Sequence, residues 1–491
     1  MRVRLLSRSS DLAVLQAEVV AEALRTRWPS LSVETLTRSS LGDRDSRVTL
    51  WDSPDRGLFT TDLSEALMSG AADLAVHSWK DLPVTGFPGT TVAGTLERAD
   101  PRDVLLVRRD VVTAQPSTLS VLTSSPRRAW QLRRSIPALL PWKIADIDAL
   151  AVRGNIPTRL QKLMSGEGDA LVVAKAALDR LLSGYAKPAA RDAIRNALDG
   201  SRWMVLPIHE FPTAPAQGAL AIEIASDRTD MHRLVEGVSH DATFRAVSME
   251  REILAGYGGG CHEAIGATVL IRDYGVVTSV RGRLPTGAEF EQWSLDPSSP
   301  QPPHARESHI WPRPDERDEA VRRPLDVTVP VDARGWWIAR ADALPDDVSP
   351  GDGQIVWAAG TRTWRKLAAR GVWVHGCSDA LGDAESPGID SLCGRDVTWR
   401  RLTHSTSSDP DAFATYAVRT MLPDDLGDRT HFFWTSGSLF REAVSRHPAI
   451  LGAWHASGPG RTSRIIRETI DDAKHVSIWL DYDQWHHHVI R

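Results

Sequence analysis

Short strand-like runs alternate with helical patterns over the first 220 residues of the chain. After the run at residues 2–6, the apolar side chains are spaced to share one face of a helix: Leu12, Leu15, Val19 and Ala23. A helical pattern at 58–68 then precedes a strand-like run at 73–77, and a run at 120–123 precedes a helix that begins at Pro126. This alternation predicts an α/β fold.

Prolines separate this region from a second α/β region. Eight of them fall in one stretch: Pro297, Pro300, Pro302, Pro303, Pro312, Pro314, Pro324 and Pro330. Because proline blocks helices and central strands, we expect an extended linker over residues 297–334. The α/β pattern resumes over residues 335–491. Its candidate strands are residues 337–339, 355–358 and 431–434.

The composition is that of a globular protein. The 491 residues are 42% hydrophobic and 25% charged, which suits several packed domains and excludes a disordered chain. A net charge of −5 gives no general attraction for nucleic acid or an anionic membrane, and no apolar run is long enough to span a bilayer. The start lacks a signal-like core, and the three cysteines lack metal-ligand spacing. We therefore expect a cytoplasmic protein without a metal.

Cys261 follows three adjacent glycines, residues 258–260, and is the most informative residue for chemistry. The glycines leave space around the sulfur, so a bulky group could approach the thiol or be attached to it. The alternative is a buried small residue beside a loop, where most free cysteines lie. We interpret Cys377 and Cys393 as packing residues.

Basic and hydroxyl residues gather at three element boundaries, at residues 8–10, 123–128 and 153–159. Pro126 and Pro157 suit the first turn of a helix, where free N–H groups and nearby arginines can face one carboxylate. A single cluster of this kind is usually a solvated face. Three of them in one α/β region favour anion sites.

Residues 77–83 place an acid beside a base directly after an apolar strand. Asp81, next to Lys80, could hold an N–H group or stabilise a cation that develops during a reaction. The alternative is an aspartate that caps a turn before Pro83. We take Asp81 as the candidate catalytic residue.

Together these segments resemble hydroxymethylbilane synthase, also called porphobilinogen deaminase, over about residues 1–300. The motifs that carry the resemblance follow one order: Arg8-Ser9-Ser10-Asp11-Leu12-Ala13, Arg56-Gly57-Leu58-Phe59, Ala75-Val76-His77-Ser78-Trp79-Lys80-Asp81-Leu82-Pro83, Asp100-Pro101-Arg102-Asp103, Thr123-Ser124-Ser125-Pro126-Arg127-Arg128, Arg153-Gly154-Asn155, Gln217-Gly218-Ala219 and the glycine-cysteine loop. So long an ordered series is specific.

The resemblance implies two α/β domains similar to type II periplasmic binding proteins and a small α+β domain that carries the cofactor. It places domain 1 at residues 1–102 and 200–220, domain 2 at 103–199 and domain 3 at 221–296. A dipyrromethane would be joined to Cys261 by a thioether. Four porphobilinogen molecules would be added to it with loss of ammonia, and hydrolysis would release hydroxymethylbilane for haem biosynthesis. We expect a monomer that contacts the next enzyme of the pathway only transiently.

The resemblance also assigns roles to individual residues. Asp81 and Lys80 would be catalytic, with Asp81 holding pyrrole N–H groups and stabilising the cation left when ammonia departs. The implied cofactor-binding residues are Cys261, Arg127, Arg128, Ser124, Ser125, Ser78 and Asp81. The implied ligands of the substrate carboxylates are Arg8, Ser10, Arg153, Arg159 and Arg180.

Several positions depart from the family pattern. Residues 50–56 carry Asp52 and Asp55 where a lysine and a glycine-rich loop are usual. Leu122 replaces a glycine, and Pro157 replaces a small or polar residue. These changes bear on rate and loop motion more than on the identity of the reaction.

Residues 335–491 resemble part of uroporphyrinogen III synthase through three segments, 356–363, 434–438 and 457–462. That enzyme would cyclise the linear tetrapyrrole with inversion of its last ring. The region has about 157 residues, which is short of two full lobes, so we expect part of one lobe to be absent. Where the family pattern has a tyrosine before the strand-end threonine, the chain reads Leu402-Thr403-His404-Ser405-Thr406.

Two other functions stay open at this stage. The chain could be a non-enzymatic two-lobe module that binds an anion, or an active deaminase whose C-terminal domain serves only for docking. Cys261 separates the first alternative from an enzyme, because a pure binder has no use for a thiol on a glycine loop.

Overall fold

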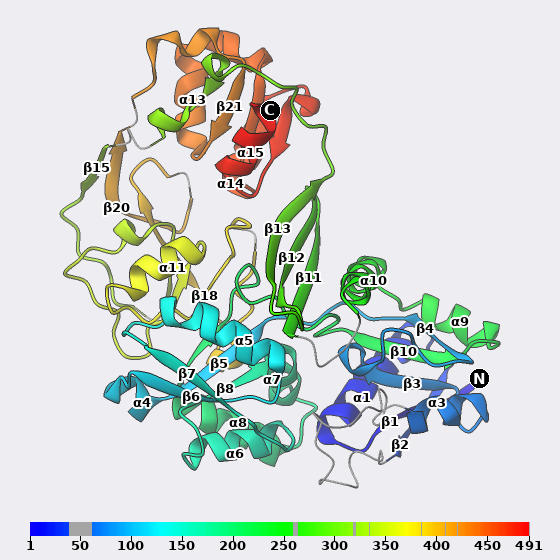
Figure 1. Ribbon diagram of the computed structural model, residues 1–491. Coiled ribbons are helices and arrows are strands. Elements are labelled where there is room, and N and C mark those ends of the chain that lie inside the picture. Colours follow the sequence, from blue (N-terminus) through cyan, green and yellow to red (C-terminus); the bar gives the residue numbers. More distant parts are fainter. Residues whose placement is uncertain are drawn as a thin grey trace. The chain divides into compact units, whose positions relative to one another are not determined.

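The computed structural model describes residues 1–38, 61–258, 264–317, 321–332, 334–383, 385–407, 409–419 and 421–490 (Figure 1). The chain divides into two compact units. The first contains Met1–Pro137, Lys143–Leu270 and Thr278–Gln292, and the second contains Ala138–Trp142, Ile271–Val277 and Trp293–Arg491. None of the helices described is both long and apolar enough to cross a membrane.

The first unit begins with a five-stranded sheet. Its order is β2 (Ser32–Arg38), β1 (Arg2–Arg8), β3 (Leu74–Ser78), β10 (Leu220–Ala225) and β4 (Thr90–Gly94). β1 runs parallel to β2 and β3, whereas β10 is antiparallel to β3 and β4. The helices that pack on this sheet are α1 (Asp11–Arg27), α3 (Thr61–Met68) and α9 (Thr229–Glu236).

Helix α1 confirms the first predicted helix but shifts its buried face. Val20 and Leu24 pack into the core with Leu5 of β1, whereas Val19 is 40% exposed. The predicted stripe is right at Leu15, which is buried, and wrong at Val19, because Val19 and Val20 are adjacent and the apolar spacing alone does not say which of them faces the sheet.

A second five-stranded sheet of mixed direction follows. Its order is β7 (Asp146–Leu150), β6 (Thr118–Leu122), β8 (Ala170–Ala174), β5 (Asp103–Arg108) and β9 (Ser201–Val205). The helices of this part are α4 (Arg109–Ala114), α5 (Pro126–Ser135), α6 (Ile156–Met164), α7 (Lys175–Leu182) and α8 (Pro188–Asp199). β9 pairs with β5, so the start of the stretch 200–220, which we expected in domain 1, lies in the second sheet instead.

The third part combines a helix with a small sheet of three consecutive strands. Helix α10 (Asp241–Gly256) precedes a three-stranded sheet of order β11 (Ala264–Arg272), β12 (Gly275–Arg283) and β13 (Glu289–Pro297). Glu250 anchors α10, because its buried carboxylate accepts hydrogen bonds from Arg98 and from the backbone N–H groups of Ala216 and Val269.

The second unit contains two sheets. The larger has the order β15 (Val321–Pro324), β20 (Ala412–Arg419), β19 (Trp399–His404), β16 (Gly335–Ile338), β17 (Val356–Ala358) and β18 (Gly376–Cys377). The smaller has the order β14 (Ile310–Trp311), β21 (His431–Trp434), β22 (Trp454–Ser457) and β23 (Val476–Ile478), with all pairs parallel. The helices are α11 (Thr361–Ala368), α12 (Asp390–Cys393), α13 (Gly437–Arg446), α14 (Arg461–Thr469) and α15 (Tyr482–Val489).

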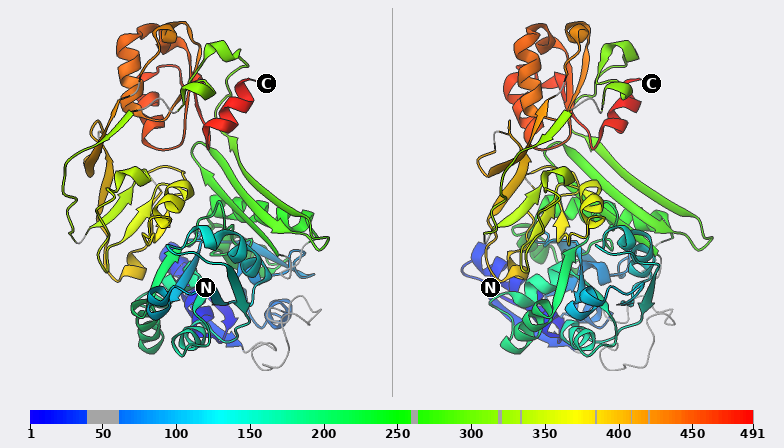
Figure 2. Two further views of the ribbon diagram at one scale, coloured as in Figure 1. Left: turned by 60° about the vertical axis from the view of Figure 1, so that its left-hand side comes forward. Right: turned by 90° about the vertical axis from the view of Figure 1, so that its left-hand side faces the viewer.

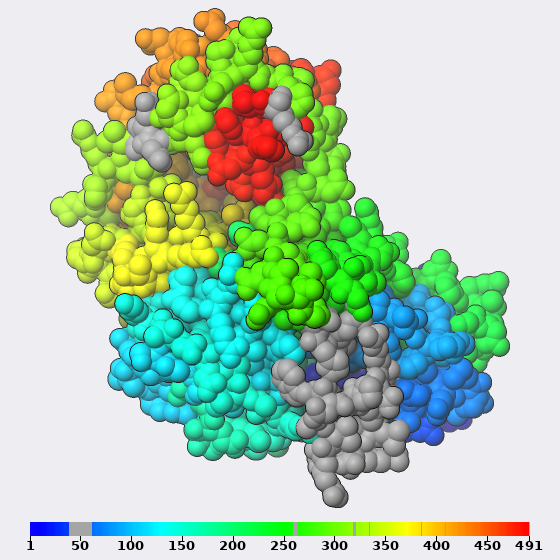
Figure 3. All heavy atoms as spheres, in the orientation of Figure 1, coloured from blue at the N-terminus to red at the C-terminus, as the bar shows by residue number. Residues whose placement is uncertain are grey.

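The smaller sheet shows how the alternation in β21 builds two cores. Phe432 and Trp434 pack with Phe440 of α13, whereas Phe433 packs with Trp485 of α15. Successive side chains of a strand point to opposite faces, so α13 and α15 cover opposite faces of the sheet (Figures 1 and 2). Helix α15 also forms part of the surface seen in Figure 3, at the red end of the colour scale.

One expectation about this region was wrong. The proline-rich segment is not only a connector, because it supplies β14 to one sheet and β15 to the other. Both are edge strands. Proline is tolerated there because one side of an edge strand forms no backbone hydrogen bonds with a neighbouring strand. The strands of the smaller sheet have only two to four residues.

Candidate functional site

A turn at the carboxyl end of β3 carries the candidate catalytic pair. Trp79, Lys80 and Asp81 form one turn of 3-10 helix, and buried Trp79 anchors it against Phe244, with ring centroids 5.2 Å apart. Lys80 Nζ donates to Gln217 Oε1 at 3.2 Å. Burial lowers the pKa of Lys80 to about 8, against the opposing effect of the Asp81 charge. The ammonium form of Lys80 is therefore less favoured than that of an exposed lysine.

Asp81 itself is exposed, and its carboxylate forms no hydrogen bond or ion pair with the residues that the structure describes. Its charge nevertheless acts on Lys80 and on Arg159, whose pKa values it raises against the effect of burial. An acid that lies near two cations without being bonded to either keeps its oxygens available to accept N–H groups from a ligand.

Asp103 at the start of β5 organises the arginines next to this turn. Its buried carboxylate accepts from Arg127 Nη2 at 2.7 Å, Arg128 Nη2 at 2.6 Å and Gln217 Nε2 at 2.9 Å. The two guanidinium charges hold the pKa of Asp103 well below its usual range, although burial opposes this. Gln217 therefore links Lys80 to the same network. Sequence reasoning missed the roles of Asp103 and Gln217, although both lie in the motifs it used.

Arg127 and Arg128 are buried and form further hydrogen bonds with the protein. Arg127 also donates to Gln131 and to the carbonyl of Pro212, and Arg128 donates to the carbonyl of Val172. The Nε atoms of both are buried and have no hydrogen-bond partner in the part of the chain that the structure describes. Two orphaned donors fit a site that takes an anion.

The serines predicted to bind the cofactor form hydrogen bonds with other groups of the protein. Ser125 caps α5 by accepting from Arg128 N at 3.4 Å, and Ser124 bonds both backbone groups of Val152. Ser78 is paired with Gln16 of α1. These side chains hold the ends of β3 and β6 in place, and each hydroxyl keeps additional acceptor capacity.

The substrate-binding candidates lie at or near the ends of helices and strands. Ser10 caps α1, and Arg8 ends β1. Arg159 lies in the first turn of α6, and its side chain donates to the carbonyl of Gly154 at 2.8 Å. Burial lowers the pKa of Arg159. Arg180 donates to the carbonyl of Gly218 at 2.7 Å, and burial lowers its pKa to about 10. Arg153 lies in the loop before α6.

Other predicted residues lie outside the described part of the chain. Cys261 is in the segment between α10 and β11, and the departures at Asp52 and Asp55 lie between β2 and α3.

Leu122 is described and is buried at the end of β6. Pro157 occupies the first turn of α6, and Pro126 occupies that of α5, as predicted.

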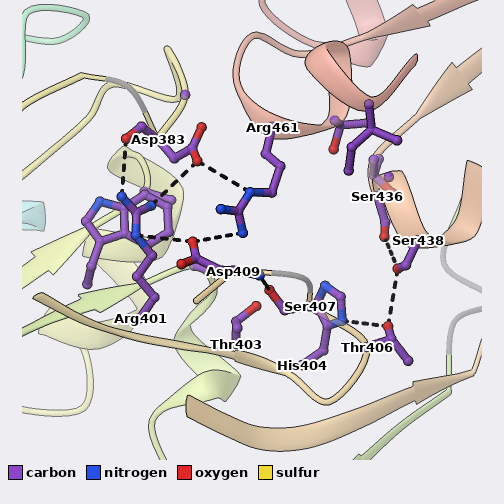
Figure 4. Close-up of a pocket in the computed structure, with 18 of the residues that line it drawn as sticks. Asp383, Arg401, Thr403, His404, Thr406, Ser407, Asp409, Ser436, Ser438 and Arg461 are labelled. Atoms are coloured by element: carbon purple, nitrogen blue, oxygen red, sulfur yellow. Dashed lines mark hydrogen bonds and ion pairs between the residues drawn. The ribbon is translucent and has the colours of Figure 1, made fainter. Parts of the chain in front are cut away.

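The second unit contains a separate cavity of about 490 Å³ (Figure 4). Its walls come from the loops after β18 and β19 and from the starts of α13 and α14. The polar and charged side chains that line it are Asp383, Arg401, Thr403, His404, Thr406, Ser407, Asp409, Thr435, Ser436, Ser438, Arg441, Arg461 and Thr462. Thr403 is 8% exposed, and no hydrogen bond of its side chain is found among the described residues.

Charges in this cavity are largely paired. Asp409 accepts from Arg401 at 3.3 Å and from Arg461 at 3.0 Å (Figure 4). Asp383 lies 3.9 Å from both Arg401 and Arg461 and pairs with Arg464, outside the cavity lining, at 2.9 Å. A row of side chains closes the other side, from His404 through Thr406 and Ser438 to Ser436. Burial lowers the pKa of His404. The cavity therefore combines arginines, hydroxyls and the N-termini of two helices, which suits a carboxylate-bearing ligand.

The fold and the first site define a mixed α/β protein that gathers cations around one exposed carboxylate. Residues 3–233 match the family model described as "Porphobilinogen deaminase, dipyromethane cofactor binding domain". The porphobilinogen deaminase of Chromobacterium violaceum is 37% identical over 273 residues, which is 55% of this chain and 81% of that protein. That of Nitratidesulfovibrio vulgaris is 36% identical over 308 residues, 59% of this chain and 90% of that protein.

The chain belongs to the porphobilinogen deaminase family. Its first part is the dipyrromethane cofactor-binding domain of that family, which confirms the expected cofactor. Among solved structures, the methionine-binding protein MetQ is 13% identical, and the match covers 51% of this chain and 95% of the MetQ chain. The TM-score is 0.30, which is too low to assign a fold.

Proposed function

We propose that the first unit is a hydroxymethylbilane synthase, which condenses four porphobilinogen molecules head to tail. Each addition breaks the C–N bond of an aminomethyl group and forms a C–C bond to the α-carbon of the preceding pyrrole. The proton displaced from that carbon leaves with the nitrogen as ammonia. The observation that carries this proposal is the carboxylate of Asp81 beside Lys80, which forms no hydrogen bond or ion pair with the described residues.

Asp81 would accept pyrrole N–H groups and stabilise positive charge as ammonia departs, because an acid already in place costs no reorganisation during the reaction. Lys80 would hold a pyrrole carboxylate and donate a proton to the departing nitrogen. Its lowered pKa favours proton transfer near neutral pH.

The dipyrromethane, joined to Cys261, would supply the pyrrole carbon to which the first substrate is added. Its carboxylates fit the buried donors of Arg127 and Arg128, with Ser78, Ser124 and Ser125 at the adjoining strand ends. We propose Arg8, Ser10, Arg153, Arg159 and Arg180 as the ligands of the substrate carboxylates. We retain the three-domain division of residues 1–296, with β9 moved to the second domain.

The test is conversion of porphobilinogen by the purified full-length chain, followed as release of ammonia and appearance of hydroxymethylbilane. Asp81→Asn should lower kcat by roughly 100-fold or more, because it removes the charge but keeps the shape. Asp192→Asn is the matched control, since Asp192 is exposed on α8. If Asp81→Asn turned over like the control, Asp81 would have no catalytic role.

The cavity of the second unit supports a second function. We propose that it binds the linear product and cyclises it to uroporphyrinogen III. The product carries eight carboxylates, two on each pyrrole, and the cavity offers Arg401, Arg441 and Arg461 with seven hydroxyl side chains. Asp383 and Asp409 already pair with Arg401 and Arg461 and so neutralise part of this positive charge, which would make binding selective for ligands with several carboxylates.

Product analysis tests the second function. The full chain is incubated with porphobilinogen, the products are oxidised, and the type I and type III porphyrins are separated. An active cavity should give type III, and Arg461→Gln should shift the product towards type I without changing ammonia release. Type I alone from the unmodified chain would leave the second unit as a docking domain.

A further inference from the structure

Helix α10 packs directly against the turn that carries Lys80 and Asp81. Phe244, in its first turn, contacts the ring of Trp79, and Val247, one turn later, lies in the same buried cluster as Trp79 and Leu82. The turn therefore rests on a helix that is distant from it in sequence.

Arg251, one further turn along α10, bonds the backbone of this segment. Its Nη1 donates to the carbonyl of Leu82 at 3.1 Å and to that of Trp79 at 3.5 Å, and its Nη2 donates to the carbonyl of Pro83 at 2.5 Å. These carbonyls flank Asp81 on both sides. One guanidinium group thus fixes the path of the chain on either side of the candidate catalytic carboxylate.

The neighbouring residue fixes the helix itself. The carboxylate of Glu250 is fully buried and takes hydrogen bonds from Arg98, from Ala216 N at 2.7 Å and from Val269 N at 2.8 Å. Glu250 thereby ties α10 to the segment before β10 and to β11. Because α10 cannot shift without breaking these bonds, Arg251 projects from a fixed support.

We propose that Arg251 is a positioning residue, which holds Asp81 in its productive place through the carbonyls of Trp79, Leu82 and Pro83. This inference rests on the proposed hydroxymethylbilane synthase activity. Asp81 makes no bond to the described protein that would orient its side chain, so its position depends on its backbone. Hydrogen bonds from a charged donor to three carbonyls are strong enough to set that backbone.

The test uses Arg251→Gln, Arg251→Lys and the control Arg245→Gln in the full-length chain. Arg245 lies on the same helix and is exposed. Arg251→Gln should lower kcat by roughly 10- to 100-fold, because displacement of a catalytic group by about 1 Å has effects of this size. KM for porphobilinogen should change by less than about 3-fold, since the carboxylate-binding arginines are untouched. Arg251→Lys keeps one charged donor and should recover part of kcat.

A double-variant cycle separates positioning from a general structural effect. If Arg251 acts through Asp81, then Arg251→Gln should lower kcat by less than about 3-fold when Asp81→Glu is already present. Intact mass and thermal unfolding of each variant establish that it is folded and carries its cofactor. Equal kcat for Arg251→Gln and Arg245→Gln, or full additivity with Asp81→Glu, would overturn the proposal.

Failure of the underlying function would look different. In that case the unmodified chain would release no ammonia from porphobilinogen, and no comparison of variants would arise. Turnover by the unmodified chain together with an unaffected Arg251→Gln variant would reject only the positioning role.

Discussion

At the residue scale, the first site depends on two acids in opposite environments. Asp103 is buried and holds two guanidinium groups, whereas Asp81 is exposed and unbonded within the described chain. Sequence motifs identified Asp81 because it follows a strand and stands beside a lysine. They did not identify Asp103, because a single acid before an apolar strand does not reveal which arginines will reach it after folding.

Lys80 gives the site a predicted pH dependence. Its pKa is lowered to about 8, so the ammonium group is present below that pH and is lost above it. We expect kcat/KM to fall above about pH 8 in a pH–rate profile. Lys80→Arg, which stays charged, should lack this alkaline limb even if it is slower. An unchanged limb in that variant would assign the titration to another group.

At the scale of elements, the prolines at helix starts were the most predictable features. Pro126 and Pro157 both stand in first helical turns, and the arginine clusters lie at the starts of α5 and α6. The roles of Ser124 and Ser125 were less predictable, because a hydroxyl beside a helix start can serve the backbone, a ligand or both. The sequence also could not predict which sheet contains β9. An alternation of apolar and polar residues identifies a strand, but it does not identify β5 as the strand with which β9 pairs.

Asp103 joins β5 to α5, so its removal should affect the stability of the second sheet. Asp103→Asn leaves Arg127 and Arg128 as buried charges without an acid, which should lower the free energy of unfolding by about 3–5 kcal/mol. The control Asp110→Asn breaks an ion pair with Arg108 in which Asp110 is 69% exposed, and it should cost at most about 1 kcal/mol. Denaturant unfolding of both variants checks this, and equal losses would contradict a special role for Asp103.

At the scale of the whole molecule, the sequence motifs and the comparisons agree on the deaminase family. The second unit was harder to predict, because its proline-rich start was interpreted as a linker although it adds an edge strand to each sheet. Its cavity was predictable only in part: segments 434–438 and 457–462, which carry the resemblance, line it, whereas Arg401 and Asp409 come from segments outside those motifs.

Cys261 connects these scales, since the proposed reaction requires a primer attached to that one sulfur atom. Intact mass spectrometry of the purified, active chain is the most direct measurement. We predict a mass above that of the polypeptide by one dipyrromethane, and the polypeptide mass alone for Cys261→Ala, with loss of turnover. An active chain with no added mass would contradict the account.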